Sequence, residues 1–270
     1  MLPELEASLR ASWPFDPEAI TVVDGALDAL DRVAQAVLSI GDTVVVEHPT
    51  FPPLLDLLEQ LGCTVIGIDV DDEGLSAEAI AGLDVEPAAI FLQPRAQNPS
   101  GVTLSARRAA EIGAIVAGTE TLVIEDDHAN DISTAPLASV GVHVPERTVH
   151  IRSFSKSHGP DLRLAAIGGA GDVVLAVANR RRLGPGWSSR ILQALLVELL
   201  ADPTTAATLR HATATYTHRR AVVADELARR GVTTVGSDGI NLWVGVDDER
   251  TALVRLAARG ISAAPGQPFQ

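Results

Sequence analysis

Several common features are scarce or missing in this 270-residue sequence, and each absence narrows the class of protein. Cys63 is the only cysteine, which excludes an internal disulfide and a cysteine zinc cluster. The chain has 21 basic and 35 acidic residues, and its net charge of −14 argues against a nucleic-acid-binding surface, which needs clustered Lys and Arg. No apolar run approaches the roughly 20 residues of a membrane-spanning helix, and the N-terminus lacks the basic start of a secretion signal. We therefore expect a soluble, cytoplasmic protein that binds neither nucleic acid nor membrane through this chain.

The sequence does contain short apolar segments that alternate with stretches of helical periodicity. Strands buried on both faces are expected at residues 43–46, 64–66, 89–92, 122–124, 149–151 and 164–167. Helices are expected over residues 27–38, 51–61 and 105–116, with Ser105 as the cap of the last one. This order is typical of an α/β fold in which a mostly parallel sheet is sandwiched by helices.

The pattern changes at residue 188. The segments expected beyond it are helices at 188–200 and 204–230, a strand at 241–244, a helix at 249–258 and a last short strand near Ile261. The length of the chain suits either one large domain or a large domain and a small one, and the change of pattern favours the second. We therefore predict a large α/β domain over residues 1–187, and linker helices with a partial small α+β domain over residues 188–270.

Polar residues at the ends of the predicted strands are the candidates for chemistry, because ligands of open α/β sheets bind there. The common nucleotide, zinc-protease and esterase motifs are absent. Four polar segments remain: Asp24-Gly25-Ala26, Gln97 to Gly101, Glu125 to His128, and Ser153 to Lys156. Taken singly, each has an ordinary interpretation as a turn, a helix cap or a solvated loop. Their order and their shared position at strand ends favour a common site.

That order resembles the pyridoxal-phosphate enzymes of the aspartate aminotransferase fold, the class I/II aminotransferases of fold type I. The resemblance is closest to the aminotransferase-like domain of MocR/GntR-type regulators, and it runs from about Ile20 to the C-terminus. The segments that carry it are Pro94 to Gly101, Glu125 to His128 and Ser155 to Leu164. The resemblance implies that residues 1–187 bind pyridoxal 5′-phosphate and that the protein is a homodimer. We expect no metal site.

Two catalytic roles follow from the resemblance. It implies that Lys156 forms the internal Schiff base with the cofactor and then moves the substrate α-proton, helped by nearby positive charge from Arg163. It also implies that Asp126 pairs with the pyridine nitrogen and keeps that nitrogen protonated. Asp127 is the less favoured partner, since it points to the other face of the strand.

The remaining cofactor contacts are carried over in the same way. Asn98 and His128 would hydrogen-bond the ring 3′-oxygen, with His128 standing where many relatives have tyrosine and titrating near neutral pH. Phe51 would stack on the ring, although core packing also accounts for it. The phosphate would be held by Gly25, Ala26, Ser153 and Arg163.

The resemblance is incomplete at both ends of the chain. Relatives have an arginine beyond the Pro265–Phe269 segment that binds the substrate α-carboxylate, and they have more residues before Asp24. We therefore expect a trimmed version of a longer protein. Arg95 and Arg152 are candidates for binding a second carboxylate, although surface ion pairs are the simpler interpretation.

Three functions remain open at this stage. The first is a pyridoxal-phosphate-dependent aminotransferase that moves an amino group between an amino acid and a 2-oxo acid. The second is the effector-sensing domain of a MocR/GntR-type regulator without its DNA-binding domain. The third is an inactive fragment, which the unassigned carboxylate-binding arginine makes credible.

Overall fold

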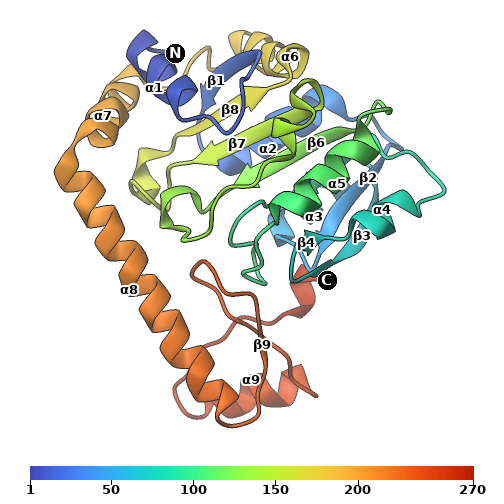
Figure 1. The fold of residues 1–270 in the computed structure, drawn as a ribbon, viewed down its shortest axis with the longest axis vertical. Coiled ribbons are helices and arrows are strands. Elements are labelled where there is room, and N and C mark those ends of the chain that lie inside the picture. The colour runs from blue at the N-terminus through green and yellow to red at the C-terminus, as the bar shows by residue number, and fades with distance from the viewer.

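The computed structural model describes residues 1–270, and an eight-stranded sheet forms its centre (Figure 1). In spatial order the strands are β1 (Ala19–Val23), β8 (Ala165–Gly169), β7 (Thr148–Ser153), β6 (Leu122–Asp127), β5 (Ala89–Leu92), β2 (Thr43–His48), β3 (Thr64–Asp71) and β4 (Gly74–Leu75). Only β8 and β4 run antiparallel to their neighbours. The predicted α/β fold with a mostly parallel sheet is confirmed, and each predicted strand of this sheet forms.

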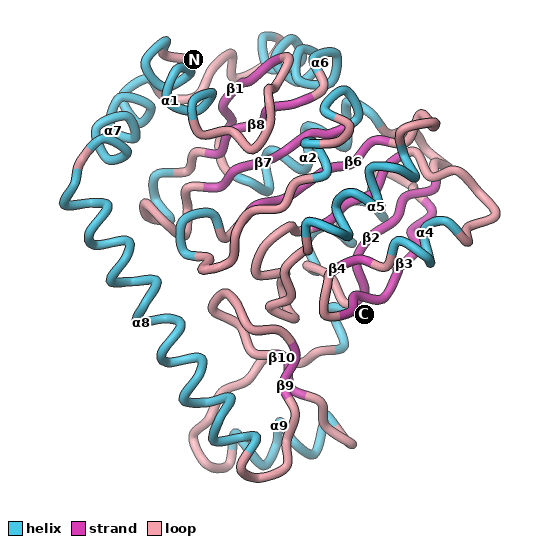
Figure 2. The backbone as a smooth tube through the Cα atoms, viewed as in Figure 1, coloured by secondary structure: helices cyan, strands magenta, loops and turns pink.

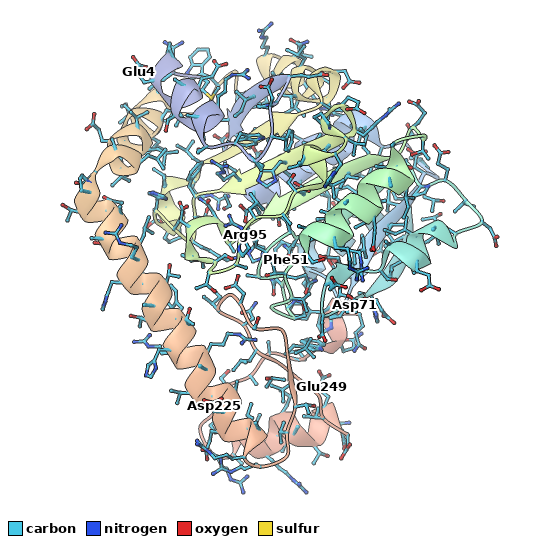
Figure 3. The ribbon with its side chains drawn as sticks, viewed as in Figure 1. Glu4, Phe51, Asp71, Arg95, Asp225 and Glu249 are labelled. Atoms are coloured by element: carbon cyan, nitrogen blue, oxygen red, sulfur yellow. The ribbon has the colours of Figure 1, made fainter.

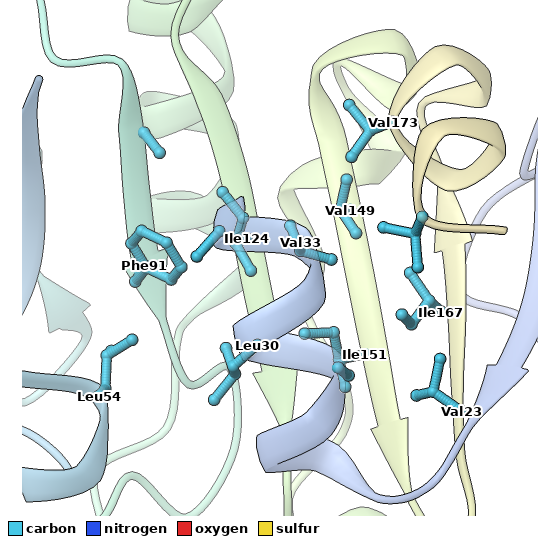
Figure 4. Packing of buried hydrophobic residues seen from close by; sticks show 14 of the residues in the cluster. Val23, Leu30, Val33, Leu54, Phe91, Ile124, Val149, Ile151, Ile167 and Val173 are labelled. Atoms are coloured by element: carbon cyan, nitrogen blue, oxygen red, sulfur yellow. The ribbon is translucent and has the colours of Figure 1, made fainter. Parts of the chain in front are cut away.

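Helices cover both faces of the sheet. They are α1 (Pro3–Ala11), α2 (Ala26–Val37), α3 (Pro52–Gln60), α4 (Ala77–Ala81), α5 (Ala106–Val116) and α6 (Gly171–Arg182). Ser105 caps α5 as predicted, since its hydroxyl accepts a hydrogen bond from the Arg108 main-chain N–H at 3.0 Å. The apolar face of α2 lies on the sheet, where Leu30 and Val33 pack beside Ile124 and Ile151 (Figure 4).

The carboxyl ends of the parallel strands meet at one edge of the sheet. The neighbours β2, β5, β6 and β7 are in parallel register there. Their main parts are mostly runs of buried apolar residues, with His150 of β7 as an exception, and polar residues gather where each strand ends. The polar side chains are therefore held on a rigid support.

A long helix connects the C-terminal part of the chain to the sheet region (Figure 2). Its elements are α7 (Arg190–Ala201), α8 (Pro203–Ala228), β9 (Thr234–Val235), β10 (Trp243–Val244) and α9 (Glu249–Ala257). The strand expected near Ile261 is wrong: the two-stranded sheet contains only β9 and β10, so that exposed segment has no strand to pair with. The strand expected at 241–244 is also shorter than predicted.

The chain ends beside the large sheet. The Phe269 carbonyl accepts a hydrogen bond from the Thr50 main-chain N–H at 2.9 Å. No helix of the chain combines the length and the apolarity needed to cross a membrane. The division into domains at residues 187 and 188 stays a prediction.

Candidate active site

Asp126 lies near the end of β6 with one carboxylate oxygen unpaired. Its Oδ2 accepts a hydrogen bond from Gln93 Nε2 at 2.8 Å, whereas its Oδ1 is buried and has no partner. Burial raises the pKa of Asp126 to about 6, although the Gln93 hydrogen bond and the charge of Lys156 act in the opposite direction. A buried acceptor without a donor is costly, so Oδ1 is suited to a ligand that brings an N–H group.

Asp127, the next residue, points to the other face of the sheet, as strand alternation predicts. Arg95 Nη2 donates to Asp127 Oδ2 at 2.5 Å, and both side chains are shielded from solvent. Burial acts to raise the pKa of Asp127, but the charge and hydrogen bond of Arg95 outweigh it and the pKa is lowered. Asp127 is thus satisfied by Arg95 together with the Asn130 main-chain N–H, which donates to its Oδ1 at 3.0 Å.

The surface ion pair suggested for Arg152 is wrong. Arg152 is buried and no carboxylate lies within ion-pair distance. Its guanidinium donates to the Ser12 carbonyl at 2.6 Å and lies over the ring of Trp13, 4.7 Å from the centroid. The helix-to-strand turn that follows α1 supplies these partners, which a local sequence pattern does not indicate.

Lys156 reaches back from the loop after β7 to His128. The Lys156 amine contacts His128 Nδ1, and His128 Nε2 donates to the Ala96 carbonyl at 3.0 Å. This second bond makes Nδ1 the acceptor nitrogen. The Ala96 backbone is in the left-handed region, with a φ of 48°, and this conformation orients its carbonyl toward His128.

Burial shifts the proton affinity of both members of this pair downward. It lowers the pKa of His128 to about 3, with the positive charge of Lys156 adding to the effect. His128 is therefore neutral near pH 7 and does not titrate there, contrary to the sequence analysis. Lys156 is exposed as a whole residue, but burial around its amine lowers its pKa against the opposing charges of Asp126 and Asp127.

Gly25 and Arg163 meet at the start of α2. Gly25 has a φ of 114°, and a side chain there would bring its Cβ to 2.9 Å from Arg163 Nη2. That nitrogen donates to the Asp24 carbonyl at 3.1 Å. Ala26 opens α2, whose first N–H groups have no partner within the helix. Backbone N–H groups and a guanidinium thus converge, which is the donor set that a phosphate requires.

Ser153 is buried at the end of β7. The one contact of its hydroxyl is weak, a 3.4 Å hydrogen bond accepted from the Ser155 main-chain N–H. The structure places Ser153 three residues from Lys156 and brings it into no hydrogen bond with Gly25 or Arg163. Its hydroxyl proton remains free to donate to an anion.

Phe51 shares a cavity with Asp126, and Asn98 is linked to Asp126 through Gln93. Phe51, labelled in Figure 3, lines a small cavity with Asp126 and Leu54 and also packs against the core, and its stacking on a cofactor ring stays a prediction. The Asn98 main-chain N–H donates to Gln93 Oε1 at 2.7 Å, and Asn98 Oδ1 accepts from Asn241 Nδ2 at 2.8 Å. The side-chain amide of Asn98 keeps its remaining donor capacity for a ligand.

Three residues at this edge were missed by the sequence analysis. Gln93 and Glu47 each end an apolar strand, a signal of the same kind as the one that identified Asp126. Asn241 lies 143 positions from Asn98 and carries no local signal. Only the docking of the C-terminal part reveals it.

These residues fit pyridoxal 5′-phosphate. Asp126 Oδ1 offers an unpaired buried acceptor for a ring N–H, and the Gly25–Arg163 contact leaves backbone and guanidinium donors for a phosphate. Lys156 supplies an amine whose lowered pKa favours the neutral, nucleophilic form. No group of three His, Cys, Asp or Glu residues is arranged to hold a metal ion.

Comparison with known proteins supports the same family throughout the chain. The family model for aminotransferase class I and II matches residues 2–270. The chain is 36% identical to the vitamin B6 salvage pathway transcriptional repressor PtsJ of Salmonella typhimurium, over 99% of this chain and 64% of that protein. It is 28% identical to the aminotransferase swnA of Metarhizium robertsii, over 88% of this chain and 53% of that protein. The chain thus spans less than two thirds of the length of either relative.

The fold has close structural counterparts. A mutant aspartate aminotransferase of Thermus thermophilus superimposes with a TM-score of 0.90 at 21% identity, over 99% of this chain and 78% of that one. That identity establishes the shared fold. Together with the family match, it shows that the chain belongs to the aminotransferase class I and II family, whose members depend on pyridoxal 5′-phosphate.

Proposed function

We propose that this chain binds pyridoxal 5′-phosphate at the carboxyl edge of the sheet and transfers an amino group between an amino acid and a 2-oxo acid. The observation that carries the proposal is the pairing of a buried, half-satisfied carboxylate at Asp126 with a single lysine amine at Lys156, close enough for each charge to affect the other. Members of this family usually act on amino and oxo acids as dimers. We extend that to a homodimer here.

The cofactor, when bound, supplies an aldehyde and a ring that draws electrons from the substrate α-carbon. Asp126 would hold a proton on the ring nitrogen through Oδ1, while Gln93 keeps Oδ2 in place. Asn98 and the donors near Gly25, Ala26, Ser153 and Arg163 would orient the ring oxygen and the phosphate, and Phe51 would cover the ring face.

Lys156 is the group that moves protons in this scheme. Its amine must be neutral to bond with the aldehyde and to take a proton from the substrate α-carbon. The neutral ring of His128 accepts a hydrogen bond from this amine and so holds it at a defined position. His128 therefore acts on Lys156 as well as on the ring oxygen suggested by the resemblance.

A second candidate function is effector binding in a transcriptional regulator. The 36% identity to the repressor PtsJ is the observation that favours it. In that case the same pocket would bind the cofactor, or its adduct with an amino acid, without complete turnover. The bound state would then change the shape of the chain through the C-terminal part that contacts Asn98.

The first experiment asks whether Lys156 carries the cofactor. Lys156 is the only lysine in the chain, so reduction with borohydride after incubation with pyridoxal 5′-phosphate can label no other lysine. We expect a yellow protein and one labelled peptide that contains residue 156. Lys156→Arg should retain the charge and lose the label, and an unlabelled wild type would refute the proposal.

A second measurement separates the two candidate functions. The purified holoprotein is mixed with a panel of amino acids, and 2-oxo acid release is followed together with the cofactor spectrum. An enzyme releases oxo acid repeatedly when a second oxo acid is supplied, whereas an effector-binding domain changes its spectrum once. A spectral change with no released oxo acid would favour the regulator.

A further inference from the structure

Gln93 joins three parts of the pocket through its main-chain N–H and the two ends of its side-chain amide. Its main-chain N–H donates to Glu47 Oε2 at 3.1 Å, and its side-chain Nε2 donates to Asp126 Oδ2 at 2.8 Å. Its Oε1 accepts the main-chain N–H of Asn98 at 2.7 Å. Because a main-chain N–H can only donate, the orientation of the Gln93 amide is settled, and its NH₂ group must face Asp126.

Glu47 is a second buried carboxyl group in the same cavity. Glu47, Gln93 and Asp126 are 3%, 7% and 5% exposed, and all three line the cavity together with Phe51. No arginine, lysine or histidine forms an ion pair with Glu47. Two buried carboxyl groups that line one cavity cannot both ionise at low cost.

The surroundings decide which of the two keeps the negative charge. Asp126 receives the side-chain N–H of Gln93 and lies near the positive charge of Lys156, whereas Glu47 has only neutral donors from Gln93 and Gln97. Burial raises the pKa of Glu47 to about 8, and the charge of Asp126 adds to that rise. Asp126 is therefore the better anion.

We propose that Glu47 is a second proton-binding group of the pocket, coupled to Asp126 through Gln93, and that it keeps its proton so that Asp126 is the only charged carboxylate lining this cavity. Glu47 and Gln93 are positioning residues in this arrangement, because they act through Asp126. The inference rests on the proposed function, because it assumes that this cavity binds the cofactor.

The other titratable groups near Glu47 are accounted for. On β3, Asp69 pairs with His48, the residue that follows Glu47 and points to the opposite face of β2. The helices above the cavity contribute the apolar side chains of Leu30 and Leu54. Their own charged residues lie elsewhere: Asp28, Asp31 and Arg32 on α2, and Asp56 and Glu59 on α3.

The first test uses the whole chain without cofactor. Carboxyl ¹³C signals of glutamate are followed through a pH titration in wild type, Glu47→Gln and the control Glu78→Gln, which replaces an exposed carboxylate. We expect one glutamate signal that titrates near pH 8 in wild type and control and is absent from Glu47→Gln. If every glutamate titrates near its ordinary pKa, the inference is overturned.

The second test uses the holoprotein and its visible spectrum. Glu47→Gln should shift the alkaline spectral transition by at least about half a pH unit, because one of two coupled protons is gone. Superimposable titrations of wild type and Glu47→Gln would overturn the inference. Gln93→Met, which removes the donor to Asp126, should weaken cofactor binding roughly tenfold.

Failure of the proposed function gives a different result. A wild type that binds no cofactor refutes the function, while the titration of the cofactor-free chain still decides whether Glu47 holds a proton next to Asp126. Should Glu47→Gln fail to fold, the elevated glutamate signal in wild type and its response to Asp126→Asn serve the same purpose. An unchanged signal in Asp126→Asn would contradict the coupling.

Discussion

The large sheet and the C-terminal part are built by different means. The strand that carries Asp126 and the strand that precedes Lys156 rest on a core of buried side chains such as Phe91 and Ile124. From residue 203 to the C-terminus, Asp238 alone is buried, and neither α8 nor α9 buries a residue. The first region is held by apolar packing and the second by a few polar contacts, so the site is rigid on one side and adjustable on the other.

The polar contacts of the C-terminal part gather at one point. Asp238 accepts hydrogen bonds from the Ser133 hydroxyl and from the main-chain N–H and hydroxyl of Thr134, both at 3.0 Å. Its own main-chain N–H donates to the Gly101 carbonyl at 3.1 Å. The Asn98–Asn241 bond lies next to this cluster in sequence. A movement of the C-terminal part would therefore act on Asn98 through its hydrogen bond with Asn241.

The largest effect should come from the core of the sheet. Phe91→Ala should lower the free energy of unfolding by about 3–5 kcal/mol, because it leaves a cavity that rigid neighbours cannot fill. Val223→Ala, on the half-exposed face of α8, should lower it by less than about 0.5 kcal/mol. Urea denaturation followed by circular dichroism measures both. Equal losses in the two variants would show that α8 is packed as tightly as the sheet core, which would contradict the comparison.

Asp126→Asn should separate stability from cofactor binding. Loss of the charge that holds the ring-nitrogen proton should weaken pyridoxal 5′-phosphate binding by about 100-fold, the value of a strong charged hydrogen bond. The cofactor-free protein should melt at a higher temperature than wild type above pH 6, because a buried charge has been removed. Fluorescence titration measures the cofactor affinity, and calorimetry measures the melting temperature. A variant that binds normally would show that Asp126 is structural.

Glu47 should make the sheet region less stable in alkali. Its pKa is raised to about 8 in the folded chain, so the folded state holds a proton that the unfolded state has already released. Stability is then lost as the pH rises toward and through 8. Between about pH 6.5 and 8.5 we expect wild type to lose about 2 kcal/mol and Glu47→Gln to lose much less. Parallel pH profiles of the two proteins, measured by urea denaturation, would contradict this assignment.

The smallest of these effects should appear in the C-terminal part. Asp238→Ala removes three accepted hydrogen bonds and should loosen residues 203–270 by about 1–2 kcal/mol while the sheet stays protected. Hydrogen exchange read separately for the two regions is the measurement. Asp247→Ala removes an exposed carboxylate without a partner and is the matched control. A loss of protection that spreads equally over both regions would show that they unfold together.

Much of the sheet region could be predicted from the sequence. Runs such as 43–46 and 89–92 are apolar and β-branched on both faces, so burial and strand formation point the same way. The polar residues that end these strands were predictable for the same reason, as Asp126 and Asn98 illustrate. Glu47 and Gln93 carry the same signal, and their place in the pocket became clear only with the parallel register of β2, β5 and β6.

The C-terminal part was harder to predict. Exposed helices such as α8 have a weak apolar face, and a two-residue strand such as β10 has little periodicity to detect. The segment near Ile261 contains strand-forming residues but finds no partner, because pairing depends on neighbours distant in sequence. The protonation of His128 likewise depends on burial, which no local pattern reports.

The sequence by itself determined the α/β alternation, because that follows from the periodicity of apolar residues. Its resemblance to a known family indicated the lysine and the aspartate expected to bind the cofactor. Tertiary structure alone decided that Glu47 and Asp126 share a cavity, that Lys156 meets His128, and that Asn241 reaches Asn98. These contacts join separate strands and loops, and their proton affinities depend on how completely packing removes water.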